Sequence, residues 1–195
     1  MKRTRFVKNM FSLSLIALFG CQTENREKAL PGKGIASFTG RETTATLRKE
    51  LTAAWLQSEK MTLTNVNQMP PEFFKFKYAD GAMTFSEQWR HCVIYTCGQL
   101  ASRTSLENPY HGIKLPVQMP KTAVIRELKT MYAFVRRSIE TLSDENLLSN
   151  CDFLGESIPV WRLFYAMENH IIHHRGQCIV YLRLNGIVPK GYYGW

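Results

Sequence analysis

Apolar side chains recur every three or four positions along four stretches of the chain, a spacing that predicts amphipathic helices. In the first stretch, Leu47, Leu51 and Trp55 follow one another on one helix face. The predicted helices cover residues 43–66, 85–105, 121–142 and 159–184, and a longer connection at 106–119 separates the second from the third. No stretch alternates apolar and polar residues as a half-buried strand does. We therefore expect an all-α protein, a four-helix bundle.

Capping residues mark the ends of two of these helices. The sequence TFSE at 84–87 has the capping-box pattern, in which the Glu side chain reaches back to the amide of the Thr. Ser157 is expected to cap the last helix, with Pro159 in its first turn. The Asn-Gly pair at 185–186 is expected to end that helix.

The formal net charge of +9 comes largely from the N-terminus. Lys2, Arg3, Arg5 and Lys8 lie in the first twenty residues, which contain no acid, so the rest of the chain carries 21 basic and 16 acidic residues, a net +5. These remaining basic residues are scattered, whereas a nucleic-acid groove needs a stripe of Lys and Arg. The charge pattern therefore argues against nucleic acid as a partner.

The first twenty residues have the pattern of a signal peptide. The basic start is followed by an apolar run from Met10 to Phe19. Ten residues at about 1.5 Å each span only half of a hydrocarbon core of about 30 Å, so the run is too short to cross a membrane. We therefore expect an exported protein with a signal peptide at 1–20.

The end of this run resembles the lipobox of bacterial lipoproteins. Leu18-Phe19-Gly20 precedes Cys21, although a small residue usually stands in the place of Phe19. The resemblance implies lipidation of Cys21 and a protein anchored in the membrane of the bacterial cell envelope. An ordinary secretory signal cut nearby is the alternative. Residues 21–40, rich in polar residues, Gly and Pro, then form a flexible tether, and the domain covers 41–195.

The stretch ENHIIHHRGQ at 168–177 holds three of the five histidines of the chain. On a helix, His170 and His174 lie within about 40° of each other, whereas His173 points about 60° away or more. The pair shares its face with apolar residues, namely Leu163, Met167, Cys178 and Tyr181. A buried imidazole needs a partner for both nitrogens, and a divalent metal ion would supply one. Histidines satisfied within the core are the alternative.

A third ligand would have to come from another helix. His91, in SEQWRH on the second predicted helix, is the candidate. Its position lies off the main apolar stripe of that helix, although Ile94 and Tyr95 make its surroundings apolar. Periodicity alone therefore leaves open whether His91 is a ligand or a surface residue.

The sequences MTFSEQWRH at 83–91 and NHIIHHRGQCIVYLRLNGIVP at 169–189 resemble the DinB/YfiT-like family of metalloenzymes. The resemblance covers about residues 41–195. It implies a four-helix bundle that binds zinc or nickel through one histidine of the second helix and two of the fourth, here His91, His170 and His174. Characterised relatives are transferases and isomerases that use low-molecular-weight thiols such as bacillithiol or mycothiol.

Three imidazoles leave one coordination position for water or substrate. An ion held in this way lowers the pKa of a bound water or thiol, so we expect a metal-dependent transferase or hydrolase with a small-molecule substrate. A zinc protease of the H-E-x-x-H type has a glutamate base directly after its first histidine, but Ile171 follows His170 here. A di-iron bundle has a histidine three residues after a glutamate, and Ile171 again stands in that place after Glu168. The sequence therefore argues against both classes. The alternative is an envelope lipoprotein that binds a metal or ligand without turnover. A homodimer is left open.

Residues beside the histidines have secondary roles in this interpretation. Arg175 and Gln177 are expected to orient the ligand rings through hydrogen bonds, although Arg175 could equally make a structural ion pair. Cys178 lies about 12 Å along the helix from His170 and is read as a core thiol. The other cysteines of the domain, Cys92, Cys97 and Cys151, could form disulfides in an oxidising compartment.

Overall fold

The computed structural model describes residues 40–191. Four long helices lie within them: α1 (Gly40–Gln68), α2 (Phe85–Thr104), α3 (Lys121–Thr141) and α5 (Val160–Leu184). Their ends agree with the predicted ends to within three residues. The prediction of four helices from apolar spacing is therefore confirmed.

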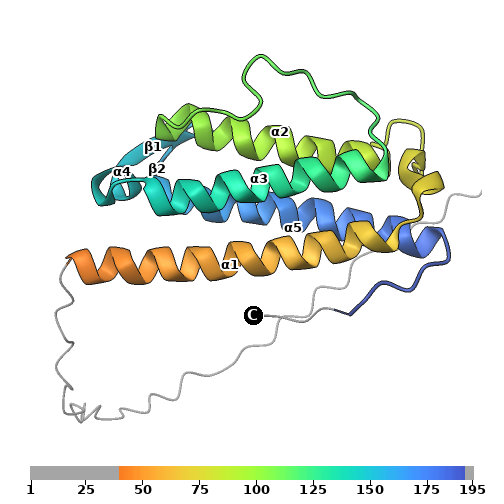
Figure 1. The fold of residues 1–195 in the computed structure, drawn as a ribbon, viewed down its shortest axis with the longest axis horizontal. Coiled ribbons are helices and arrows are strands. Elements are labelled where there is room, and N and C mark those ends of the chain that lie inside the picture. The colour runs from red at the N-terminus through yellow and green to blue at the C-terminus, as the bar shows by residue number, and fades with distance from the viewer. Residues whose placement is uncertain (1–39, 192–195) are drawn as a thin grey trace, which may run out of the picture. The chain divides into compact units, whose positions relative to one another are not determined.

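The four helices pack side by side as a bundle (Figure 1). α1 packs against α3 and α5, and α2 packs against the same two helices. α2 and α3 run in the same direction, because the connection 105–120 carries the chain back along the bundle before α3 begins (Figure 1). One long crossover of this kind is a known variant of the four-helix bundle. As a result, α2 and α5 are antiparallel neighbours (Figure 1).

Each long helix contributes large side chains to the core. Trp55, Trp89, Tyr132 and Phe164 come from α1, α2, α3 and α5, and all four are fully buried. The rings of Trp55 and Tyr132 meet edge to face, with centroids 5.9 Å apart. Aromatic side chains bury large areas and prefer this geometry, so they stabilise the bundle across helix pairs.

The capping box at the start of α2 is confirmed. The side chain of Thr84 accepts a hydrogen bond from the amide of Glu87 at 3.2 Å, and the Glu87 carboxylate accepts one from the amide of Thr84 at 2.7 Å. At the C-terminal end of α5, Asn185 is the C-cap residue, and Gly186 follows it with φ of +74°. Glycine adopts this backbone conformation without strain, which explains why the helix ends there.

Replacing Thr84 by alanine should lower the free energy of unfolding by about 1 kcal/mol, because the cap is lost. Thr84→Ser keeps the hydroxyl and should stay within about 0.5 kcal/mol of the natural protein. Urea unfolding of the two variants measures the difference. An equal loss in both would show that the methyl group, rather than the cap, stabilises this site.

The expectation that no strand is present was wrong. A short antiparallel hairpin, β1 (Asn150–Phe153) and β2 (Glu156–Pro159), lies between the short helix α4 (Asp144–Leu148) and α5. Leu154 and Gly155 form its turn, with φ of +57° and +84°, and a two-residue turn with positive φ at both positions suits a hairpin. Strands of four residues are too short to produce a recognisable alternation.

The same hairpin corrects the predicted start of the last helix. Ser157 lies in β2, and α5 begins at Val160 with Pro159 as its N-cap and no side-chain cap. The amide of Val160 instead donates to the carbonyl of Ser149 at 2.9 Å. Backbone pairing thus takes the place of the expected serine cap.

A short 3-10 helix, η1 (Pro71–Lys75), follows α1.

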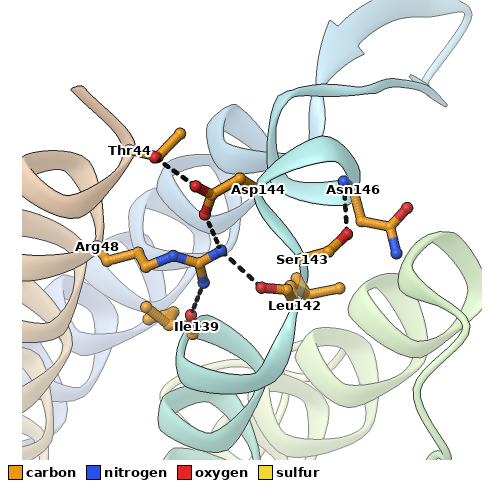
Figure 2. A network of polar contacts seen from close by, with 7 residues as sticks. All are labelled: Thr44, Arg48, Ile139, Leu142, Ser143, Asp144 and Asn146. Carbon is orange, nitrogen blue, oxygen red and sulfur yellow. Dashed lines mark hydrogen bonds and ion pairs between the residues drawn. The ribbon is translucent and has the colours of Figure 1, made fainter. Parts of the chain in front are cut away.

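A polar network braces the turn between α3 and α4 against α1 (Figure 2). Arg48 of α1 donates to the carbonyl of Ile139 and, at 2.6 Å, to that of Leu142, at the end of α3. It also pairs with the carboxylate of Asp144 at 2.8 Å, which accepts a second bond from Thr44 at 2.8 Å. The last carbonyls of a helix have no partner within it, so Arg48 supplies one from a neighbouring helix.

The sequence-based predictions for the N-terminus concern residues 1–20, Cys21 and the tether that follows. They lie outside the described residues, apart from Gly40, which is already helical. Among the helices of 40–191, none combines the length and the apolar character that a membrane crossing requires.

Candidate metal centre

α2 and α5 bring three imidazoles together. His91 comes from α2, and His170 and His174 lie one turn apart on α5. The Nε2 atom of His170 lies 3.1 Å from the Nε2 atom of His91 and 3.1 Å from that of His174. One nitrogen of each ring lies within 4.8 Å of the others. The structure therefore gathers at one point the three residues that the family resemblance implied.

This spacing suits a metal ion. At metal–nitrogen distances of about 2.0–2.1 Å, two tetrahedral ligand atoms lie about 3.3–3.4 Å apart, and two at right angles about 2.9 Å apart. The two measured separations of 3.1 Å fall between these values. All three nitrogens also lie within 4.8 Å of one another, so the cluster could hold a metal.

The three imidazoles are neutral at neutral pH. Burial lowers the pKa of His174 to about 3 and that of His170 to about 4, and in both cases neighbouring imidazoles lower it further. The pKa of His91 is also lowered, by burial and then by the charge of Arg90. A neutral ring keeps a lone pair on one nitrogen, which is the form that coordinates a metal.

Gln88 holds one of the candidate ligands in place. This α2 residue is buried, and its side-chain oxygen Oε1 accepts a hydrogen bond from Nδ1 of His174. With Nδ1 occupied in this way, Nε2 of His174 is left for the cluster. Sequence reasoning missed Gln88. The available signal was its place three positions before His91, close to the same helix face.

The cluster cannot satisfy its own nitrogens. Nδ1 of His170 is buried and has no hydrogen-bond partner among residues 40–191. If Nδ1 carries the proton of this neutral ring, a buried donor is unpaired and the Nε2 lone pairs of His170 and His174 face each other at 3.1 Å. If Nε2 carries it, a buried lone pair on Nδ1 is left without a donor. A cation among the Nε2 atoms would remove the lone-pair repulsion, which is why this donor set fits a metal better than a closed hydrogen-bond network.

One tyrosine packs against two of the rings. Tyr95 stacks on His91 with ring centroids 5.5 Å apart and planes at 28°, and its centroid lies 4.5 Å from that of His170. Tyr95, His91 and His170 are all half-buried, whereas His174 is buried. The cluster is therefore less buried on the side of His91 and His170 than on the side of His174.

A family model described as the DinB family matches residues 41–195, most of the chain and nearly all of the bundle. The chain belongs to the DinB family. Among curated proteins, an uncharacterized protein named YrdA from Bacillus subtilis (strain 168) is 34% identical over 62 residues. That match spans 32% of this chain and 37% of the length of YrdA.

Two solved structures of DinB-like proteins share the fold. One, from Bacillus subtilis, has a TM-score of 0.60 and 18% identity, and the match covers 74% of this chain and 96% of that one. The other, from Bacillus cereus ATCC 10987, has a TM-score of 0.60 and 21% identity, with 76% and 97% of the two chains covered. At this identity the likeness concerns the fold alone.

His173, the third histidine of the α5 stretch, stays outside the cluster of this DinB-family chain. It is exposed, and its ring meets that of His174 only edge to face, with centroids 5.1 Å apart. The helical prediction that His170 and His174 share a face, while His173 lies on the flank, is confirmed.

Arg175 faces a different helix. Its Nη1 atom lies 3.3 Å from the hydroxyl of Thr62 and 3.4 Å from both oxygens of Ser58, all on α1. These bonds to neutral oxygens support a structural role for Arg175, but the expected ion pair is not among the salt bridges of residues 40–191. Gln177 is half-buried and has no hydrogen bond to the histidines within residues 40–191. It is therefore Gln88, and neither Arg175 nor Gln177, that makes the described hydrogen bond to a ligand ring.

The cysteines of the domain are free thiols. Cys92, Cys97 and Cys178 are buried, Cys151 is half-buried, and no disulfide joins these four described residues. Burial raises the pKa of Cys97 to about 12 and that of Cys178 well above its usual range. Cys178 is thus a core thiol, as expected.

His111 in the long connection is exposed and lines an open surface pocket with residues of α2, including Gly98 and Ser102.

Proposed function

We propose that His91, His170 and His174 hold a divalent metal ion, with zinc or nickel as the first candidates, and that the protein is a metal-dependent enzyme. The convergence of three neutral imidazoles on one point carries this proposal. The choice of zinc or nickel rests on the family resemblance and on the all-nitrogen donor set, which suits both ions.

A site with three protein ligands limits the reaction classes that come into question. An ion held by three protein ligands would keep one coordination position free and would supply Lewis acidity there. His91 and His170 are only half-buried, which supports access of a small molecule to this position. Both thiol transfer and hydrolysis fit such a site. Hydrolysis agrees better with the proposed export, because low-molecular-weight thiols are abundant in the cytosol.

A non-catalytic binding protein is the second candidate, and one observation favours it. Glu168 precedes the first ligand on α5 by two residues, yet it is buried against α1, where it bonds to Ser58 and lies close to Arg175. It is therefore not placed to act as a general base at the cluster. A protein that binds a metal or ligand without turnover would need no such base.

Metal analysis of the purified full chain tests the proposal first. We expect one divalent ion per chain after exposure to zinc or nickel. The loaded protein is then screened for thiol transfer and for hydrolysis of esters and amides. One ion per chain without any turnover would favour the binding protein, whereas absence of metal under all of these conditions would contradict both candidates.

We also propose that the protein is anchored in the bacterial cell envelope through a lipidated Cys21, with its signal peptide removed. The lipobox-like sequence before Cys21 supports this. Cys21→Ser should move the protein from the membrane fraction to the soluble fraction, because several acyl chains on one cysteine anchor stably. Cys151→Ser, which alters a thiol of the folded domain, is the control and should leave the protein in the membrane. Retention of Cys21→Ser in the membrane would contradict the anchor.

A further inference from the structure

We propose that Tyr181 determines, through Gln88, which ring nitrogen of His174 carries the proton. Tyr181 would then be a positioning residue for the metal centre, although no hydrogen bond joins it to His174 among the described contacts. Its importance for metal binding rests on the function proposed above, whereas its effect on His174 can be measured without any metal.

Hydrogen bonds connect Tyr181 to the cluster through one intermediate. The hydroxyl of Tyr181 donates to the backbone carbonyl of Met83. The side-chain nitrogen Nε2 of Gln88 donates to the Tyr181 oxygen at 3.4 Å, and Oε1 of Gln88 accepts from Nδ1 of His174. Tyr181 is fully buried, and Gln88 and His174 are 6% and 7% exposed, so bulk water has little access to replace these partners.

The direction of each bond follows from the one before it. A carbonyl can only accept, so the hydroxyl proton of Tyr181 points at Met83. The Tyr181 oxygen is then left to accept, which favours the NH2 group of Gln88 on that side. The amide oxygen of Gln88 must therefore face His174, and an oxygen can only accept. Nδ1 of His174 consequently carries a proton, and in the neutral ring Nε2 presents a lone pair to His91 and His170.

Loss of the Tyr181 hydroxyl would remove this preference. Without an acceptor for its NH2 group, the Gln88 amide can rotate by half a turn and present NH2 to His174. Nδ1 would then accept, and the proton of the neutral ring would move to Nε2, where it occupies the position that a metal needs. The amide has two orientations, so Tyr181 acts by making one of them favourable.

The ring of Tyr181 is held firmly enough for this role. Phe76 and Tyr78 meet it edge to face, with centroids 5.9 and 5.6 Å away, and Phe85 packs against it at 6.3 Å. Phe76 and Tyr78 belong to the segment between η1 and α2. These contacts involve the ring and not the hydroxyl, so Tyr181→Phe should keep the packing and remove only the hydrogen bonds.

Nuclear magnetic resonance of the metal-free full chain tests the inference. Long-range nitrogen–proton spectra of histidine labelled with nitrogen-15 show which ring nitrogen carries the proton. We expect His174 to be protonated on Nδ1 in the natural protein. In Tyr181→Phe, a substantial fraction should be protonated on Nε2 instead, and the affinity for zinc should fall about 10-fold, as for other residues that orient ligands.

A rescue variant separates this effect from a general loss of structure. The carboxylate of Gln88→Glu can only accept, so the double variant Gln88→Glu/Tyr181→Phe should return the proton of His174 to Nδ1. Tyr165→Phe is the matched control, because Tyr165 is a half-buried α5 tyrosine whose ring packs on Trp161, near the other end of the helix. It should leave His174 unchanged.

Each outcome decides the matter. A natural protein with the proton on Nε2 of His174, or a Tyr181→Phe variant with an unchanged His174, would overturn the inference. Should Tyr181→Phe fail to fold, Gln88→Met removes both the C=O and the NH2 of the side-chain amide, and an unchanged His174 in that variant would overturn the inference equally. A His174 that responds to Tyr181 in a chain that binds no metal would support the inference while contradicting the proposed function.

Discussion

Alanine at His91, His170 or His174 should remove nearly all bound metal from the purified full chain. Two imidazoles cannot fill a site built for three, and the missing ring opens a second position to water. Residues that only orient ligands typically change metal affinity by 10- to 100-fold, so removal of a ligand itself should cost more than about 100-fold. Titration against a chelator of known affinity measures the change for zinc and nickel.

His173→Ala is the matched control for this experiment. His173 lies on the same helix and next to His174 in the chain, but it is exposed and outside the cluster. Its removal should leave one ion per chain. If His173→Ala emptied the site while His170→Ala kept it full, the assignment of helix faces would be wrong. If all four variants bound metal equally, the ion would lie elsewhere.

Arg175→Met should lower the free energy of unfolding by about 2 kcal/mol, the scale expected when the hydrogen bonds of a buried charged group are lost. Arg175 and Glu168 are 7% and 9% exposed, and both bind Ser58. Burial raises the pKa of Glu168, and the charge of Arg175 opposes that rise. Methionine fills a similar volume but supplies neither the charge nor the hydrogen bonds to α1. Urea unfolding of the metal-free protein measures the loss.

Arg183→Met is the control, because Arg183 is an exposed arginine near the end of the same helix. Its effect should stay within about 0.5 kcal/mol. Under conditions where Arg175→Met is folded, it should still bind one ion per chain with nearly unchanged affinity, since Arg175 faces α1. A large loss of metal affinity with little loss of stability would instead support the ligand-orienting role first considered for Arg175.

The parts of the fold that rest on local chemistry could be predicted well. The capping box at Thr84 and the helix end at Asn185 depend on neighbours within four residues, and both are present as expected. The β1–β2 hairpin was missed because its strands are too short to show a period. The serine cap at Ser157 failed for a related reason: strand pairing with Asn150–Phe153 competes for the same segment.

In the candidate site, too, the sequence predicted what depends on near neighbours and missed what depends on distant ones. His170 and His174 could be paired from helical geometry alone, because residues four apart on a helix always share a face. No local rule could decide whether His91 points toward them, and only the resemblance to a family singled it out. Gln88 was missed because a glutamine three residues before a histidine has no meaning until its partner, 86 residues away, is known.

The sequence by itself therefore determined the four helices, most of their ends and the shared face of His170 and His174. These follow from a repeat of 3.6 residues and from bonds to near neighbours. Only the tertiary structure decided which residues meet across helices: His91 with His170, Gln88 with His174, and Arg175 with α1. Helical periodicity predicts on which face of its helix a side chain lies. Which other helix packs against that face depends on how the connection 105–120 and the β1–β2 hairpin place the helices. That placement results from burial of the whole apolar surface at once, and no single stretch of sequence contains it.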